Sequence, residues 1–234
     1  IPLPNDLFRP ERPNSWGIDL NDKPELERVA QAVAAPLDFR TEPGALPEEA
    51  VARARSAFVD WSSRSVDDRA SCLERLADLL ERDRDMLMRI AVQEAKKTIP
   101  DALAEVREAV DFCRYYAAQA RKGLCPVELP GPTGERNVLR MEGRGVFVCI
   151  APWNFPLAIF LGQVSAALAA ASGVSERYLA QLEAGEGNIS VLLLRKVARA
   201  MSVSVERLEG GLDASGKPVT LRGVPAGDST RSPR

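Results

Sequence analysis

The residues best suited to chemistry are Pro-Trp-Asn-Phe-Pro at 152–156. A continuous β-prone apolar run, 145–150, precedes them, and an apolar helical pattern begins at about residue 157. They are therefore expected at the carboxyl end of a strand, where open α/β folds bind ligands. Asn154 can donate its amide N–H to an oxyanion from a mount held between two prolines, and Trp153 offers a flat apolar wall. The alternative is a proline-framed turn that binds no ligand, and the spacing leaves both interpretations open.

The composition limits the other chemistries that this chain can perform. It contains no histidine, which excludes Ser-His-Asp and Cys-His catalysis and any histidine-ligated metal site within it. The four cysteines (Cys72, Cys113, Cys125 and Cys149) match no Cys-x-x-Cys metal or redox spacing. No base or helix N-terminus is recognisable beside them, so we expect buried, reduced thiols of a cytoplasmic protein and no metal.

Length and charge favour an ordinary globular chain. Its 234 residues leave room for one or two domains, with 45% hydrophobic and 27% charged residues. The net charge of −2 gives no basic excess that would mark nucleic acid as the main partner. Because the first residue is Ile1 and no signal peptide is visible, a fragment or a processed chain is expected.

Residues 145–175 carry no charge and are numerous enough to raise the question of a membrane span. The stretch contains Pro152, Pro156 and Gln163, is rich in alanine, and is not followed by a cationic flank. We therefore expect a buried strand that leads into a buried helix, and no membrane association.

The elements that must position these residues are mostly helical. Apolar residues at spacings of three and four predict helices at 25–35, at 48–61, from 66 onward, through 86–91, and at 101–120. The proline-rich residues 1–24 are expected to form an extended arm that lies on something larger.

The pattern changes from helical to β-like after Gly123. Residues 137–141 alternate, and with 145–150 they predict two strands joined by a tight connection at 142–144. A buried helix is expected over 157–170, and a turn at 172–175.

The run 145–157 resembles the NAD-dependent aldehyde dehydrogenase family. Upstream, Trp61, Arg69 and the segments 94–98 and 105–117 are similar to that family's N-terminal helices. The opening Leu-Pro-Asn-Asp-Leu-Phe at 3–8 narrows the resemblance to the glutamate γ-semialdehyde dehydrogenase part of the bifunctional proline-utilisation enzymes. The resemblance covers about residues 1–170.

The resemblance implies a reaction and roles for two residues. It implies oxidation of L-glutamate γ-semialdehyde (1-pyrroline-5-carboxylate) with NAD during catabolism of proline to glutamate, with FAD confined to a separate domain of such enzymes. Asn154 is implied as the catalytic oxyanion donor to a thiohemiacetal, and Trp153 with Asn154 as the lining of the cofactor cleft. The family's catalytic Cys, general-base Glu and glycine-rich turn lie beyond the match, and none of the four cysteines occupies the nucleophile position. We therefore expect a truncated piece that is inactive alone.

A second resemblance begins where the first one ends. Residues 168–185, and further segments up to 208, are similar to a helix-turn-helix of the Cro/XRE type. This implies a DNA-binding regulator as the alternative function, with Ser175, Glu176, Arg177 and Gln181 facing DNA from a recognition helix. Two observations argue against it: 155–163 replaces the family's usually basic first helix, and 171–208 carries a net charge of only +1. A small helical bundle that binds no DNA is the other interpretation.

Together these patterns predict an α/β fragment, with the N-terminal helices and first strands of an aldehyde dehydrogenase cofactor domain followed by a small all-α segment. The expected divisions are an arm and linker at 1–47, the dehydrogenase part at 48–170, the helix-turn-helix-like segment at 166–209, and a disordered tail at 210–234. Because one helix cannot easily serve both families, a join between unrelated coding segments is expected near residue 170. An uncovered strand at 146–150 is expected to promote self-association.

Overall fold

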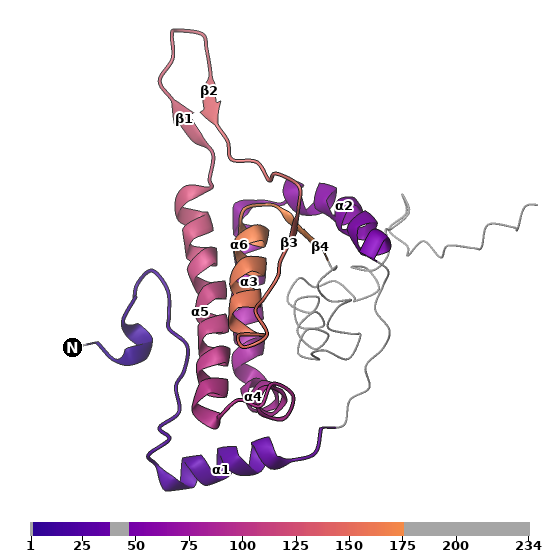
Figure 1. Cartoon of the computed structure of the whole chain (residues 1–234). Helices are drawn as coiled ribbons and strands as arrows, with labels where there is room; N and C mark the ends of the chain where they lie inside the picture. The colour runs from indigo at the N-terminus through magenta and orange to yellow at the C-terminus, as the bar shows by residue number, and fades with distance from the viewer. Residues whose placement is uncertain (1, 38–46, 176–234) are drawn as a thin grey trace, which may run out of the picture.

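Six α-helices and four short strands make up residues 2–37 and 47–175, the part of the chain that this computed structural model describes (Figure 1). The helices are α1 (Lys23–Ala34), α2 (Pro47–Ser63), α3 (Val66–Arg82), α4 (Arg84–Gln93), α5 (Ile99–Gly123) and α6 (Ala158–Ala169). The strands are β1 (Val127–Leu129), β2 (Asn137–Leu139), β3 (Val146–Val148) and β4 (Gly173–Ser175), and a 3-10 turn, η1 (Pro4–Asp6), lies near the N-terminus. The predicted helix-rich α/β class is confirmed in this part of the chain.

Side-chain caps define where the two central helices begin. Ser65 precedes α3, and its Oγ accepts the backbone N–H of Asp68 at 3.1 Å while donating to the Asp68 carboxylate at 2.7 Å. Thr98 precedes α5 and makes the same pair of bonds with Asp101, at 3.3 and 2.7 Å. Pro100 falls in the first turn of α5, where its missing N–H costs nothing. The helix therefore begins at Ile99, before the start at 101 that the sequence pattern predicts.

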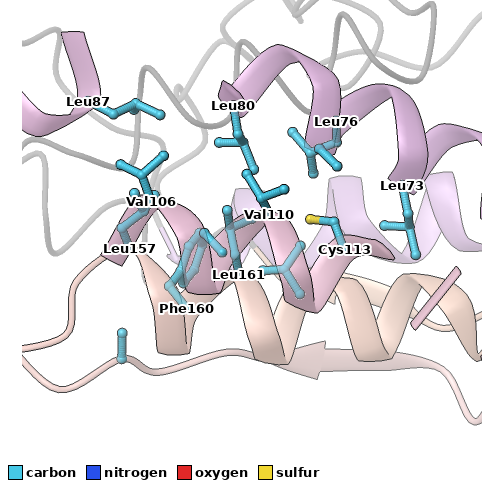
Figure 2. Close-up of a cluster of buried hydrophobic side chains, with 14 of the residues drawn as sticks. Leu73, Leu76, Leu80, Leu87, Val106, Val110, Cys113, Leu157, Phe160 and Leu161 are labelled. Atoms are coloured by element: carbon cyan, nitrogen blue, oxygen red, sulfur yellow. The ribbon is translucent and has the colours of Figure 1, made fainter. Parts of the chain in front are cut away.

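The hydrophobic core lies between α3, α5 and α6, which run side by side (Figure 1). Figure 2 shows the stripes that meet there: Leu73, Leu76 and Leu80 from α3, Val106, Val110 and Cys113 from α5, and Phe160 and Leu161 from α6 with Leu157 just before it. All of these side chains are buried. A single buried leucine contributes about 1.5–3 kcal/mol relative to an exposed one, so this interface is the main source of stability in the described part.

The strands form two separate two-stranded sheets. β1 and β2 pair antiparallel, with Val127 opposite Leu139, and form a hairpin that projects beyond the end of α5 (Figure 1). β3 and β4 pair parallel, with Val146 opposite Gly173. α6 supplies the crossover connection that a parallel pair requires.

Three local expectations from the sequence are wrong. The strand expected to be buried is largely exposed among the described residues, because only β4 pairs with β3 there and no second layer covers Phe147 and Val148. The segments 137–141 and 145–150 do not pair with each other, because β2 pairs with β1 and β3 pairs with β4. Gly145, at φ +112°, lets the chain take a left-handed conformation directly before β3. Residues 173–175, expected within a turn, form strand β4 instead, because β3 offers them a parallel partner.

The N-terminal arm lies along α5 (Figure 1) and is attached through polar contacts. Ser15 donates its backbone N–H and its Oγ to the Asp111 carboxylate, at 2.9 and 2.8 Å. Arg114, nearly buried, donates to the carbonyl of Asn14 at 3.0 Å and forms an ion pair with Glu81 at 3.1 Å. The division of the chain into domains stays a prediction.

None of the helices described is long and apolar enough to cross a membrane. The expected helix-turn-helix residues after 175 and the expected tail at 210–234 lie outside the described residues.

Candidate functional site

The predicted site residues form an exposed turn between β3 and α6. Phe155 donates its backbone N–H to the carbonyl of Pro152 at 3.0 Å, which closes the turn. Trp153 is 85% exposed and Asn154 is also exposed. Within the described residues the Asn154 amide makes no hydrogen bond, so it is available as a donor. The structure thus places Trp153 and Asn154 together at the carboxyl end of β3.

A buried carboxylate lies directly behind this turn. Glu105 of α5 is 3% exposed, and its Oε2 accepts the backbone N–H groups of Leu157 at 3.1 Å and Ala158 at 2.8 Å. These N–H groups belong to the first turn of α6, where a negative charge is favoured by the helix dipole. Glu105 therefore caps α6 from another helix, 52 residues earlier in the chain.

Lys97 completes this arrangement with a positive charge. Its Nζ lies 2.9 Å from Glu105 Oε1, and the two side chains are 12% and 2% exposed. The same Nζ lies 4.8 Å from the centre of the Phe155 ring, a cation–π distance. Lys97 thus links the buried carboxylate to the residue that follows Asn154.

The pKa of Glu108, one turn further along α5, is affected by the same charges. Partial burial raises the pKa of its carboxyl group, the negative charge of Glu105 raises it further, and Lys97 lowers it. Glu108 is exposed, so water screens these effects. It is a surface group beside the Glu105–Lys97 pair.

The capped N-terminus of α6 bears on cofactor binding. In many dinucleotide-binding folds the pyrophosphate sits on free N–H groups at such a helix start. Here the N–H groups of Leu157 and Ala158 already bind Glu105. The start of α6 therefore does not provide a free pyrophosphate site, and the roles of Trp153 and Asn154 in cofactor binding stay predictions.

The cysteines do not form a nucleophilic centre in this region. Cys72, Cys113 and Cys149 are buried and Cys125 is exposed, so the expectation of buried thiols is wrong for Cys125. Burial raises the pKa of Cys113 to about 12 and that of Cys149 to about 11. Burial also raises the pKa of Cys72, which the nearby Arg75 lowers in part. Thiols with such pKa values are not thiolates near neutral pH.

Other sites are poorly developed in the part of the chain that is described. No group of three or more acidic, cysteine or histidine side chains there could hold a metal ion. A groove of about 320 Å³ between α2 and β3 is mainly apolar, and no residue of the 152–156 turn lines it. Its lining residues are Val51, Arg55, Phe58, Gly145, Val146 and Val148.

The residues predicted to face DNA are only partly described. Ser175 is the last residue of β4, and Glu176, Arg177 and Gln181 lie outside the described residues. Sequence reasoning also missed Glu105 and Lys97. A signal for Glu105 was present, because it occupies a core-facing position of α5 among the buried residues Ala102, Val106 and Ala109.

Comparison with known proteins identifies the class. The sequence profile of the aldehyde dehydrogenase family matches residues 40–174. Since this is more than half of the chain, the protein belongs to the aldehyde dehydrogenase family. A second profile, described as helix-turn-helix, matches residues 164–208 and overlaps the first one in α6 and β4.

Within this class the chain is similar to proline-utilisation proteins. It is 38% identical over 207 residues to bifunctional protein PutA of Klebsiella aerogenes, covering 74% of this chain and 15% of that protein. It is 37% identical over 228 residues to PutA of Escherichia coli K12, covering 82% and 16%. The chain therefore spans about a sixth of the length of these relatives.

The chain is also similar to solved structures of proteins with these names. A crystal structure of Bradyrhizobium japonicum PutA matches with a TM-score of 0.74 and 42% identity, over 87% of this chain and 21% of that one. The 1-pyrroline-5-carboxylate dehydrogenase of Thermus thermophilus matches with a TM-score of 0.64 at 24% identity, over 80% and 43% of the two chains, which supports the fold alone.

Proposed function

We propose that residues 48–170 belong to a dehydrogenase unit that oxidises L-glutamate γ-semialdehyde to glutamate with NAD in proline catabolism. The observation that carries the proposal is the Asn154 amide, exposed and free of hydrogen bonds within the described residues, at the carboxyl end of β3. The names of the relatives, bifunctional protein PutA and 1-pyrroline-5-carboxylate dehydrogenase, support the substrate class. The aldehyde dehydrogenase family generally uses NAD or NADP.

In this role Asn154 acts as a hydrogen-bond donor. When a thiolate adds to the aldehyde carbon, the C=O electron pair moves to the oxygen, which becomes negatively charged. The Asn154 amide donates to this oxygen and need not break an existing protein hydrogen bond to do so. Trp153 supplies an apolar wall beside it. When bound, NAD supplies the hydride acceptor.

A chimeric enzyme tests this role. Residues 47–175 would replace the matching segment of E. coli PutA, and NADH formation from glutamate γ-semialdehyde would be measured. We expect Asn154→Ala to lower kcat by about 10²–10³-fold, and the matched control Asn137→Ala, at a half-buried residue of the β1–β2 hairpin, to leave it unchanged. A folded chimera in which Asn154→Ala retains full activity would contradict the proposal.

We also propose that this sequence does not oxidise aldehydes by itself. Three of its thiols are buried with raised pKa values. The exposed Cys125 lies beyond the C-terminal end of α5, about 30 Å along the helix from Glu105, which lies behind the 152–156 turn. NADH formation with a short aldehyde should equal the blank, and any turnover above the blank would disprove this proposal. Turnover that survives Asn154→Ala would also show that the activity does not use Asn154.

DNA binding is the second candidate, favoured by the helix-turn-helix profile over residues 164–208. In that role Glu176, Arg177 and Gln181 would contact base edges or phosphates. A gel-shift series across salt concentrations tests it with operator-like duplexes and an Arg177→Ala variant. Binding that weakens with salt supports this function, whereas no detectable binding at low salt removes it, because non-specific binding should appear there.

A further inference from the structure

Two side chains hold the backbone on either side of the Asn154 turn. Before the turn, Gln163 of α6 makes both bonds to Ile150: its Nε2 donates to the Ile150 carbonyl at 2.8 Å, and its Oε1 accepts the Ile150 N–H at 2.7 Å. After the turn, Glu105 Oε2 accepts the N–H groups of Leu157 and Ala158. The chain is thus fixed to the helical body at both ends of the turn, with Asn154 midway between them.

Local sequence does not supply the cap that Glu105 provides. Leu157 occupies the N-cap position of α6 and has no side chain able to cap, and the first turn of α6 contains no acidic residue. Without Glu105, the N–H groups of Leu157 and Ala158 would lose their hydrogen-bond acceptor. The backbone that follows Asn154 therefore depends on a residue of α5.

Stability alone does not account for a charged pair at this place. A buried ion pair contributes little net stability compared with apolar residues of similar volume, because both charges lose their water. Glu105 and Lys97 are both largely buried, and Lys97 also contacts the ring of Phe155. Lys97 thus contacts Phe155 within the turn, and Glu105 binds the N–H groups of Leu157 and Ala158 directly after it.

We propose that Glu105 and Gln163 are positioning residues for Asn154, with Lys97 orienting the Glu105 carboxylate. They fix the backbone of residues 150–158, and with it the position of the Asn154 Cα–Cβ bond from which the amide reaches substrate. The proposal rests on the role of Asn154 as oxyanion donor. Such preorganisation matters because an oxyanion donor is effective only when it is already aligned.

The test measures the order of the turn in the full chain, with no substrate or cofactor. In ¹⁵N-labelled protein, the side-chain amide signals of Asn154 report its environment, and hydrogen exchange reports the N–H groups of Ile150, Leu157 and Ala158. We expect Glu105→Ala to accelerate exchange at Leu157 and Ala158 at least tenfold and to shift or broaden the Asn154 signals. Gln163→Leu should do the same at Ile150. Glu105→Gln, which keeps an oxygen acceptor but no charge, should have a smaller effect.

Three controls separate positioning from general stability. Lys97→Arg keeps the ion pair and should retain the wild-type signals, whereas Lys97→Met should disturb them. Glu108→Gln changes an exposed carboxyl one turn away and should have no effect. Should Glu105→Ala fail to fold, Glu105→Gln and Gln163→Leu decide the question.

Either of two results would overturn the proposal. One is an unchanged Asn154 signal in both Glu105→Gln and Gln163→Leu. The other is exchange that rises by the same factor at Val29 of α1 as at Leu157, which would show a loss of global stability only. Failure of the proposed function is distinguishable, because it would appear as an Asn154→Ala chimera with full activity and would leave these signals unaffected.

Discussion

Arg69 of α3 donates its Nε–H to the carbonyl of Ala169, the last residue of α6, at 3.3 Å. Both groups are buried, and burial lowers the pKa of Arg69, although an arginine stays charged. With Glu105 at the other end, α6 has a negative side chain at its N-terminus and a positive one at its C-terminus, the arrangement that a helix dipole favours. Other helices thus supply the polar caps for this apolar, uncharged helix.

Trp61 makes a second bond to the same end of α6, which gives the first prediction. Its Nε1–H donates to the Leu168 carbonyl at 3.0 Å in a buried position. Trp61→Phe leaves that carbonyl without this donor and should lower the free energy of unfolding by about 1–3 kcal/mol. Urea denaturation measures the change. Trp16→Phe, at a residue that is 59% exposed, is the control and should change it by less than about 0.5 kcal/mol.

The second prediction concerns the exposed Lys96, whose backbone has φ +54°, a left-handed conformation that non-glycine residues rarely adopt. Lys96→Gly should raise the free energy of unfolding by about 0.5–1 kcal/mol, since relief of about 1–2 kcal/mol of strain is partly offset by the entropy of glycine in the unfolded chain. Lys96→Ala keeps the strain and should give no gain. Equal effects of the two substitutions would show that the backbone is not strained here.

The helices could be predicted from sequence because their apolar spacings are local. Leu73, Leu76 and Leu80 mark the buried face of α3 without any knowledge of its partners. The strand pairings could not be predicted, since they depend on where distant segments meet. Val146 pairs with Gly173 across the whole of α6, and α6 in turn packs on α5.

The exposed residues of the candidate site could be predicted from the sequence, whereas the role of the buried carboxylate behind them could not. Trp153 and Asn154 lie in the expected strand-to-helix turn, because the prolines and the apolar run that define it are adjacent in sequence. The core-facing position of Glu105 could be predicted, but its role as a cap could not, because its partner N–H groups lie 52 and 53 residues away. Backbone N–H groups also carry no sequence signal.

A third prediction follows from close backbone approach at Gly143. A Cβ at this position would lie far inside contact distance of the Ala171 carbonyl oxygen. Gly143→Ala must therefore separate the chain before β3 from the end of α6, and should cost about 1–3 kcal/mol. Gly123→Ala is the matched control, because a Cβ there meets no atom within 4 Å. If both variants melt at the wild-type temperature, the contact at Ala171 is not present in solution.

The fourth prediction concerns the reactivity and the pKa of the cysteine thiols. Ellman's reagent at pH 8 should label only Cys125 rapidly in the folded chain and all four cysteines after unfolding, since the other three are buried.

Cys113 has a pKa of about 12 when folded, against about 8.5 in an unfolded chain. The unfolded state therefore loses this proton first as pH rises.

Stability should accordingly fall between about pH 8.5 and 12, by up to about 1.4 kcal/mol per pH unit from this one thiol. Cys113→Ala removes a buried group and is less stable throughout, but its stability should fall less steeply over that range. Parallel curves for the two proteins would show that Cys113 is not the group responsible.

The last prediction concerns self-association through β3. Among the described residues β3 pairs with β4 along one edge only, and Phe147, Val148 and Ile150 are 47%, 49% and 63% exposed. An apolar strand with a free edge is a template for pairing between chains, and a lysine on it opposes such pairing. We expect wild-type protein to elute from a size-exclusion column as species that grow with concentration, and Val148→Lys to shift it toward the monomer. Val59→Lys, on an exposed position of α2, should leave the elution unchanged. A sharp wild-type monomer peak with a cooperative thermal transition would show that another part of the chain covers β3.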